Sequence, residues 1–305
     1  MLGVDPVFRA EIERRNPESS AWLEGLPTLC RALGRRWGVV QDGAPRHGRT
    51  SMVVPVVGAR GPAVLKLVSP VGRVEAEARA LSVLAGRGAV SLLAVSVDDR
   101  ALLLDRIDGP SLAGLDDPHE AVGLAGEVAA RVAGVPAPDD APKLAALAAT
   151  WLRELRAQHV KAQEAGVPVP EELSCAAIDV IEALTGDTTD TLTHGDLSLE
   201  NIMRSAAGRW LAIDPLLLCG PVAYEAHTVV RSLLPRIVAS ERPAALLREL
   251  TRRFCDTAHA DYEQSQLLSL ARSVASYYWE AQHHGNPANV ERLRRLSMLT
   301  GRMLA

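Results

Sequence analysis

Residues 193–201 spell THGDLSLEN and residues 210–215 spell WLAIDP. Together they supply an aspartate, Asp196, an asparagine five positions later, Asn201, and a second aspartate, Asp214, after a short apolar segment. A loop of four residues lets the first two side chains turn toward one point. Glycine and small residues between the two segments predict a hairpin that returns the second aspartate to the same place.

This set of side chains fits phosphoryl transfer. The reaction needs a carboxylate beside the attacking hydroxyl, and a carboxamide and a second carboxylate that hold Mg²⁺ on the nucleotide phosphates. We predict that Asp196 is the catalytic residue and that Asn201 and Asp214 are the metal ligands. A lone His-Gly-Asp is more often a turn in which the aspartate accepts backbone hydrogen bonds. The complete spacing is much more specific than that tripeptide.

The same segments resemble the signature motif of the aminoglycoside phosphotransferases, which have a protein-kinase-like fold. Within that family the chain is most similar to the streptomycin 6-kinase and hydroxyurea phosphotransferase branch, through WLAIDP, AVLK at 63–66, GRGAV at 86–90 and LLL at 102–104. The resemblance spans about residues 22–231. It implies ATP and Mg²⁺ as cofactors, and it makes His194 a structural brace beneath the metal-binding segment.

The implied fold is α+β and two-lobed. Residues 1–107 are expected to form a nucleotide-binding lobe, with two helices over 7–36 and a five-stranded antiparallel sheet. Residues 108–305 are expected to form a mostly helical catalytic and substrate lobe, which begins at a linker, DGPS, at 108–111. The helices predicted there cover 117–132, 145–165, 170–184, 223–236, 242–257, 260–283 and 287–304. His159 is expected on a solvated helix face.

Lys66 lies on the third predicted strand. In the kinase scheme such a lysine holds the α- and β-phosphates and pairs with a glutamate on the next helix, here predicted over 74–84. The resemblance implies that this glutamate is Glu77, the position on which the family's glutamate falls when counted back from the GRG at 86–88. Glu75 lies two positions away on the same helix and therefore points to another side, so only one of the two can meet the lysine.

Three further nucleotide contacts are predicted. A glycine-bearing turn at 42–48 precedes the strand that contains Ser51, and backbone amides near this residue are candidates for phosphate contact. The G-x-G-x-x-G signature is absent, so an ordinary hairpin remains the alternative. The kinase-like resemblance implies that Asp105 and Ile107, at the end of the last strand, bind adenine through backbone groups. Side-chain identity matters little for such contacts.

Carboxylates on the C-terminal helices are candidates for binding a cationic acceptor, because paired charges offset the desolvation of ammonium groups. These candidate substrate residues are Glu225, Asp261, Glu263 and Glu280. Pro221 stands where the resembling branch usually has an aspartate. The aromatic run YYW at 277–279 lies beside the last carboxylate, and it either lines a cleft or belongs to the core.

The composition argues against several classes of protein. The chain has 305 residues, is 48% hydrophobic and has a net charge of −4, which gives no case for nucleic-acid or membrane attraction. No apolar run approaches the ~20 residues that span a bilayer. Residues 1–15 contain no apolar signal segment, which favours the cytoplasm. The four cysteines lack zinc-site spacing and are expected to be reduced core residues: Cys30, Cys175, Cys219 and Cys255.

These observations predict an ATP-dependent kinase that phosphorylates a hydroxyl of a small antibiotic, foremost an aminoglycoside such as streptomycin. One alternative is another small acceptor, such as hydroxyurea, a cationic peptide antibiotic or a metabolite. A second alternative is a catalytically silent nucleotide-binding protein. The degraded glycine loop and Pro221 are consistent with this alternative. A helical binding protein without kinase activity is disfavoured by the set Lys66, Asp196, Asn201 and Asp214.

Overall fold

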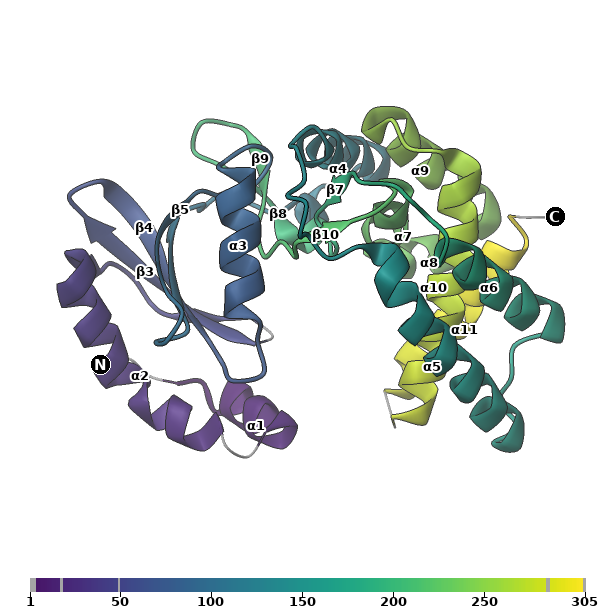
Figure 1. Cartoon of the computed structure of the whole chain (residues 1–305), viewed down its shortest axis with the longest axis horizontal. Helices are drawn as coiled ribbons and strands as arrows, with labels where there is room; N and C mark the ends of the chain where they lie inside the picture. The colour runs from purple at the N-terminus through teal and green to yellow at the C-terminus, as the bar shows by residue number, and fades with distance from the viewer. Residues whose placement is uncertain (1–3, 17–18, 49, 284–285, 304–305) are drawn as a thin grey trace. The chain divides into compact units, whose positions relative to one another are not determined.

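The computed structural model describes residues 4–16, 19–48, 50–283 and 286–303. Contacts within the chain divide it into two compact units (Figure 1). The first unit comprises Met1–Asp108 with Ser205–Ala207, and the second comprises Gly109–Arg204 with Gly208–Ala305.

An antiparallel sheet organises the first unit. Its strands lie in the order β1 (Val39–Gln41), β3 (Ser51–Gly58), β4 (Gly61–Val68), β6 (Ala101–Asp105) and β5 (Leu92–Ser96). A sixth strand, β2 (Arg46–His47), pairs with β3 inside the segment predicted as a turn. Within the described residues the sheet therefore has one strand more than the prediction. Two residues are too short to display the alternation that identifies a strand.

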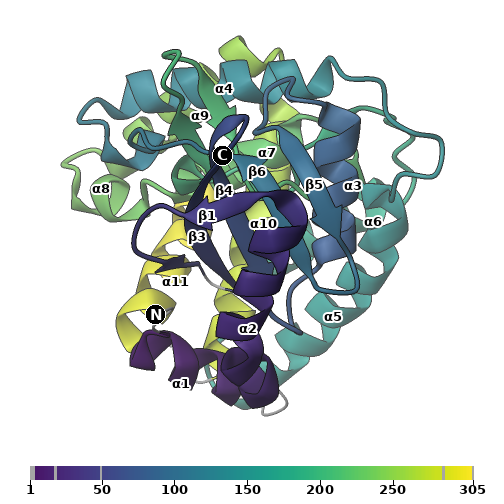
Figure 2. The same cartoon turned by 90° about the vertical axis from the view of Figure 1, so that its left-hand side faces the viewer.

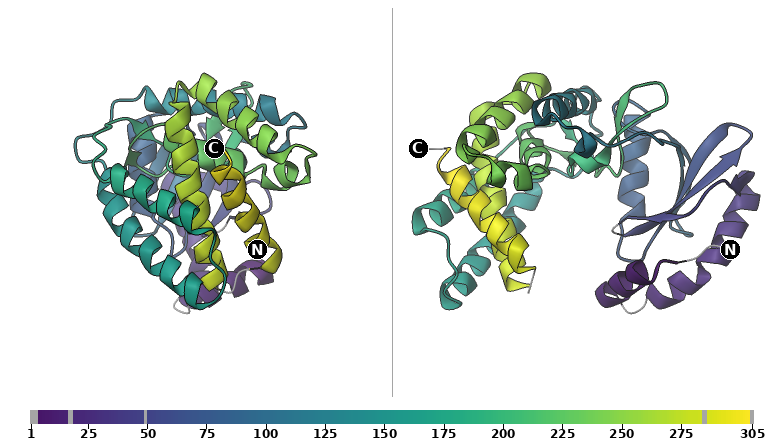
Figure 3. Two further views of the ribbon diagram at one scale, coloured as in Figure 1. Left: turned by 90° about the vertical axis from the view of Figure 1, so that its right-hand side faces the viewer. Right: turned by 180° about the vertical axis from the view of Figure 1, so that it is seen from behind.

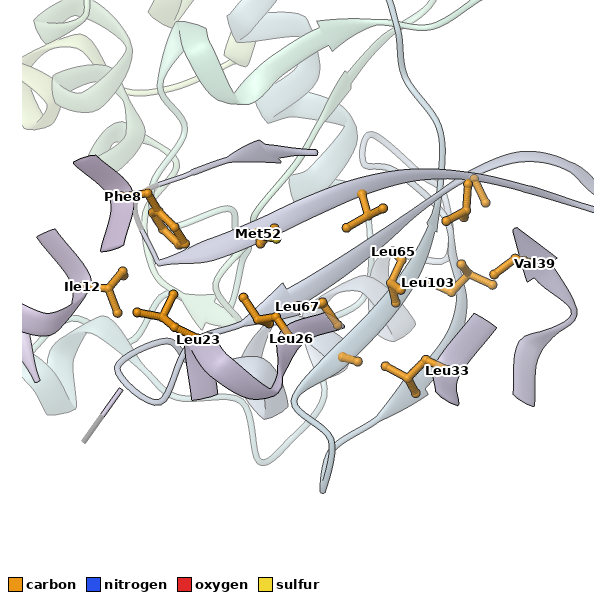
Figure 4. Close-up of a cluster of buried hydrophobic side chains, with 14 residues drawn as sticks. Phe8, Ile12, Leu23, Leu26, Leu33, Val39, Met52, Leu65, Leu67 and Leu103 are labelled. Atoms are coloured by element: carbon orange, nitrogen blue, oxygen red, sulfur yellow. The ribbon is translucent and has the colours of Figure 1, made fainter. Parts of the chain in front are cut away.

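Helices cover both faces of this sheet. Helices α1 (Pro6–Arg15) and α2 (Ser19–Trp37) lie on one face, and α3 (Val74–Leu84) lies on the other (Figures 1 and 2). Figure 4 shows Phe8, Leu26, Leu65 and Leu67 pointing into one apolar cluster between the first two helices and the strands. Because side chains alternate along a strand, Lys66 must point to the opposite face, toward α3.

The second unit is mostly helical (Figure 3). Its helices are α4 (Pro118–Ala133), α5 (Leu144–Glu164), α6 (Glu171–Leu184), α7 (Ala223–Arg231), α8 (Leu234–Ala239), α9 (Pro243–Ala258), α10 (Tyr262–Gln282) and α11 (Pro287–Gly301), with short 3₁₀ turns η1 (Leu112–Gly114) and η2 (Leu199–Asn201). The helix predicted over 223–236 is two helices in the structure. Pro235 lies in the first turn of α8 and lacks an N–H, so it suits a new helix and not a continued one.

Two small antiparallel pairs complete the second unit. Strand β8 (Ile202–Arg204) pairs with β9 (Trp210–Ala212), which confirms the predicted hairpin. Strand β7 (Leu192–Thr193) pairs with β10 (Leu218–Cys219). Across the part of the chain described, no helix combines the length and apolar character that a membrane crossing requires.

The prediction that His159 lies on a solvated face is wrong. Its side chain is buried, and its Nδ1 lies 3.0 Å from the hydroxyl of Tyr278 on α10. That hydroxyl also lies 2.9 Å from Oγ of Ser174 on α6, and burial raises the pKa of Tyr278, which keeps the phenol neutral. The helical pattern of α5 could not show that α10 covers this face. Tyr277 is also in the core, whereas Trp279 is 49% exposed.

The cysteines are free thiols, as expected, but they do not share one environment. Cys219 and Cys255 are buried. Cys30 is partly buried and Cys175 is exposed, so the prediction of core positions is wrong for the exposed residue. Local composition does not report which side of a helix meets solvent.

Close packing between α4 and α9 predicts that Gly126→Ala destabilises the protein. A β-carbon at this position would overlap Thr257 and lie 2.8 Å from the carbonyl oxygen of Phe254. Overpacking of this kind costs about 1–3 kcal/mol, which outweighs the ~1 kcal/mol that alanine usually gains over glycine inside a helix. We expect a lower midpoint in thermal unfolding.

The matched control is Gly25→Ala in the middle of α2. Nothing lies within 4 Å of a β-carbon there, so this variant should be as stable as the parent protein or more stable. Equal or higher stability for Gly126→Ala would contradict the packing argument.

Candidate active site

A buried ion pair joins β4 to α3 in the first unit. The Nζ of Lys66 lies 2.7 Å from both Oε1 and Oε2 of Glu77, and both side chains are buried. This is the pairing that the sequence predicted for Glu77. A buried pair adds little net stability, because desolvation offsets the Coulomb attraction, so its value lies in fixing where the ammonium sits.

His194 braces the catalytic loop of the second unit, here defined as residues 194–201. Its Nε2 lies 2.9 Å from the carbonyl oxygen of Ile213, which can only accept a hydrogen bond, so Nε2 must carry the proton. The other ring nitrogen, Nδ1, accepts from the backbone N–H of Asp196 at 3.3 Å. Both ring nitrogens of His194 thus form hydrogen bonds to the backbone, as a structural brace would.

Asp196 and Asn201 are joined within the same loop. Asp196 is exposed between buried neighbours, and its carbonyl oxygen accepts from Nδ2 of Asn201 at 3.0 Å. A carbonyl oxygen can only accept, so this bond places the amide nitrogen of Asn201 toward the loop backbone. The carboxamide oxygen then points away from that backbone and can serve as a ligand.

Asp214 follows β9 at a strained backbone position. Its φ is 59°, in the left-handed region that residues with a β-carbon seldom adopt. The flanking backbone is tied to the catalytic loop, because Ile213 N donates to Asn201 O and Leu216 N donates to His194 O, each at 2.8 Å. Such strain persists where the surroundings hold it, and it often accompanies a functional site.

The chemistry of these oxygen donors fits Mg²⁺. No group of three or more His, Cys, Asp or Glu side chains gathers as a metal site within the described ranges. Mg²⁺ that travels with nucleotide phosphates needs only one or two protein ligands, since phosphate and water oxygens supply the others. A carboxamide oxygen from Asn201 and a carboxylate from Asp214 meet that requirement.

Glu225 occupies a different position from the one predicted. It lies in the first turn of α7 and is 1% exposed. Its Oε1 accepts from Gly195 N at 2.6 Å and its Oε2 accepts from Leu197 N at 3.3 Å, so both oxygens hold the catalytic loop. The buried carboxylate faces the loop backbone and not solvent. No local sequence pattern predicts a hydrogen bond between residues that are thirty positions apart.

The other three candidate carboxylates lie at the two ends of α10. Asp261 caps α10, and its Oδ1 accepts from Gln264 N at 2.6 Å. Glu263 is exposed in the first turn of the same helix. Glu280 lies near the other end, where Oε1 accepts from Nδ2 of Asn289 at 2.9 Å. Most of the length of α10 therefore separates Asp261 and Glu263 from Glu280.

The predicted nucleotide contacts of the first unit lie on strand ends. Ser51 begins β3, is buried, and its carbonyl oxygen accepts from Gly48 N at 2.9 Å. Asp105 ends β6, and its N–H donates to Ser91 O at 3.0 Å. Ile107 follows the strand, and no backbone hydrogen bond among the described residues involves it. Backbone groups of Ile107 are therefore better candidates for adenine than the amide of Asp105.

Known proteins resemble this chain over most of its length. A family model described as aminoglycoside/hydroxyurea antibiotic resistance kinase matches residues 36–284. Streptomycin 6-kinase of Streptomyces griseus is 30% identical over 269 residues, which cover 87% of this chain and 86% of that protein. Hydroxyurea phosphotransferase of Kitasatospora aureofaciens is 33% identical over 268 residues, which cover 86% of this chain and 75% of that protein.

Solved structures share the fold. A thermostable mutant of aminoglycoside phosphotransferase APH(4)-Ia, in a ternary complex with AMP-PNP and hygromycin B, has a TM-score of 0.58 and 13% identity. The likeness covers 90% of this chain and 98% of that one. At this identity it bears on the fold alone, and it confirms the predicted protein-kinase-like α+β architecture. The family model and the relatives together show that the chain belongs to the aminoglycoside/hydroxyurea antibiotic resistance kinases.

Proposed function

We propose that the protein transfers the γ-phosphoryl group of ATP to a hydroxyl of an aminoglycoside such as streptomycin, and so inactivates the antibiotic. The observation that carries the proposal is the hydrogen-bonded catalytic loop, in which Asp196 is exposed and its backbone is bonded to His194 and Asn201. The streptomycin 6-kinase relative supports the choice of acceptor. ATP use places the reaction in the cytoplasm.

Each residue has a proposed role. Asp196 orients the acceptor hydroxyl and receives its proton, and the bond from its N–H to His194 keeps the loop in place. Lys66 holds phosphate oxygens while Glu77 fixes the ammonium. Asn201 and Asp214 would hold Mg²⁺, which neutralises phosphate charge when it is bound. Phosphoryl transfer depends mainly on such positioning and electrostatics.

The two predicted lobes would divide this work. Residues 1–107 would bind the nucleotide, with backbone groups near Ser51 on phosphate and those of Asp105 and Ile107 on adenine. Residues 108–305 would supply the catalytic loop and the acceptor site. Asp261, Glu263 and Glu280 remain proposed contacts for a cationic acceptor. Glu225 is not suited to that role, because both of its oxygens already accept backbone hydrogen bonds.

Hydroxyurea is the second candidate acceptor. The hydroxyurea phosphotransferase relative is 33% identical, so identity alone does not favour streptomycin. Hydroxyurea is small and uncharged, and its recognition would not need the carboxylates on α10. The two acceptors would therefore share the catalytic loop but differ in whether they need the carboxylates on α10.

An acceptor panel tests the proposed function. Purified protein with ATP and Mg²⁺ is offered streptomycin, hydroxyurea, a cationic peptide antibiotic and simple sugars, and ADP release is followed by a coupled assay. We expect streptomycin to raise ADP release far above the acceptor-free rate, with the new phosphate ester located by NMR. A response to hydroxyurea alone would select the second candidate. No response above ATP hydrolysis from any acceptor would overturn the proposal.

A further inference from the structure

We propose that Arg100 is a positioning residue for the Lys66–Glu77 pair. It lies in the turn between β5 and β6, and its guanidinium holds the loop that leads into α3. The proposal rests on the proposed function, in which Lys66 holds the nucleotide phosphates and Glu77 fixes its ammonium group. It adds a residue that sets the place of the helix that carries the glutamate.

The hydrogen bonds of the Arg100 guanidinium go to carbonyl oxygens of one short segment, residues 68–72. Its Nε donates to Val68 O and Ser69 O, each at 3.2 Å. Its Nη2 donates to Ser69 O at 2.8 Å and to Gly72 O at 2.6 Å. The Arg100 carbonyl in turn accepts from Val68 N at 2.8 Å. A planar guanidinium presents several N–H groups in fixed directions, so these bonds fix the segment more rigidly than a single ammonium would.

The segment held in this way joins the two charged partners. Lys66 lies on β4, which ends at Val68, and Glu77 lies in the first turns of α3. Arg73, the residue before the helix, makes no side-chain capping bond. The start of α3 is therefore defined by the incoming loop rather than by its own cap. Movement of that loop moves Glu77 relative to the lysine.

The backbone of Arg100 supports a side-chain role. Its φ is 51°, in the left-handed region, and its N–H closes the turn on Val97 O at 2.9 Å. Glycine or asparagine is the relaxed choice at such a position, since a β-carbon there is strained. The hydrogen bonds from its guanidinium to the loop before α3 explain why an arginine stands at this strained position.

The other side of the turn is also anchored. Asp99 Oδ2 accepts from Ser96 Oγ at 2.7 Å and from Nη1 of Arg36 on α2 at 2.6 Å. These two hydrogen bonds lower the pKa of Asp99, so its carboxylate stays charged. The turn thus connects α2 to the loop before α3: Asp99 contacts α2, and Arg100 contacts the loop.

The central experiment uses Arg100→Gly, which removes the guanidinium and relieves the backbone strain, so the fold should be retained. We expect kcat/KM for ATP to fall about tenfold while KM for the acceptor stays unchanged. Arg100→Lys, which can reach some of the same carbonyls, should restore part of the loss. Arg60→Ala, an exposed arginine in the β3–β4 turn, is the matched control and should behave like the parent protein.

A double-mutant cycle and hydrogen exchange give two further readouts. If Arg100 acts through Glu77, then Arg100→Gly should add little to the defect of Glu77→Gln. Amides of residues 70–80 should exchange faster in Arg100→Gly and not in the Arg60 control. Unchanged exchange there, or fully additive effects on kcat/KM, would overturn the proposal. A parent protein without ATP-dependent turnover would instead overturn the proposed function, and the exchange result would still test the role of Arg100.

Discussion

Asp196→Asn should lower kcat by about three orders of magnitude while ATP affinity stays within about twofold. Asparagine keeps the size of the side chain but cannot receive the proton of the acceptor hydroxyl. The loop should survive, because His194 and Asn201 bind the backbone N–H and C=O of this residue and not its carboxylate. Coupled ADP release gives kcat, and calorimetry with ATP and Mg²⁺ gives the affinity.

The control for this variant is Asp179→Asn, an exposed aspartate on α6. It removes the same charge from the same unit and should leave kcat unchanged. A turnover number of Asp196→Asn within tenfold of the parent enzyme would assign the proton transfer to another group. Loss of ATP affinity together with turnover would instead indicate that the carboxylate organises the metal-binding loop.

Local signals in the sequence were sufficient for the framework of the candidate site. The β8–β9 hairpin was predictable because a glycine-containing turn separates two apolar segments. Helix α3 begins and ends where predicted. Lys66 pairs with Glu77, the glutamate that the family resemblance implied, and helix geometry allows only one of Glu75 and Glu77 to face it. These relations span about eleven residues or fewer.

Distant contacts were not predictable in the same way. Glu225 bonds to amides thirty residues earlier, and Arg100 bonds to carbonyls about thirty residues earlier. His159 meets Tyr278 across more than a hundred residues. A pattern of apolar and polar positions reports the period of a helix, but it does not identify the element that packs against each face. These side chains acquire their roles only when the fold brings the elements together.

Glu225→Gln should lower both stability and turnover, with a loss of about 1–3 kcal/mol in unfolding free energy and a fall of at least roughly a hundredfold in kcat. The carboxylate accepts from two backbone N–H groups, Gly195 N and Leu197 N. Glutamine offers one acceptor oxygen and an NH₂ group, so one of these buried amides would face another donor. The loop that presents Asp196 would then shift or lose a bond.

Ser232→Ala is the graded comparison for this variant. Ser232 Oγ accepts from Leu199 N at 3.1 Å and donates to Thr228 O at 3.2 Å, so the same helical region holds a third amide of the loop. Removing this neutral acceptor should cost less than removing the charged one, about 0.5–1.5 kcal/mol. Glu154→Gln, an exposed glutamate on α5, should change neither stability nor turnover.

Glu225→Gln also distinguishes two interpretations of Glu225, as a ligand of the acceptor or as a support of the catalytic loop. If the carboxylate binds a cationic acceptor, Glu225→Gln would raise KM for that acceptor and leave thermal unfolding unchanged, because an exposed charge contributes little to folding. If it holds the loop, the unfolding midpoint falls and the amide proton signals of Gly195 and Leu197 shift upfield, as expected when a hydrogen bond to a carboxylate is lost. The exposed fraction of 1% and the two N–H donors favour the second result. Parent-like unfolding with a raised acceptor KM would return Glu225 to the substrate site.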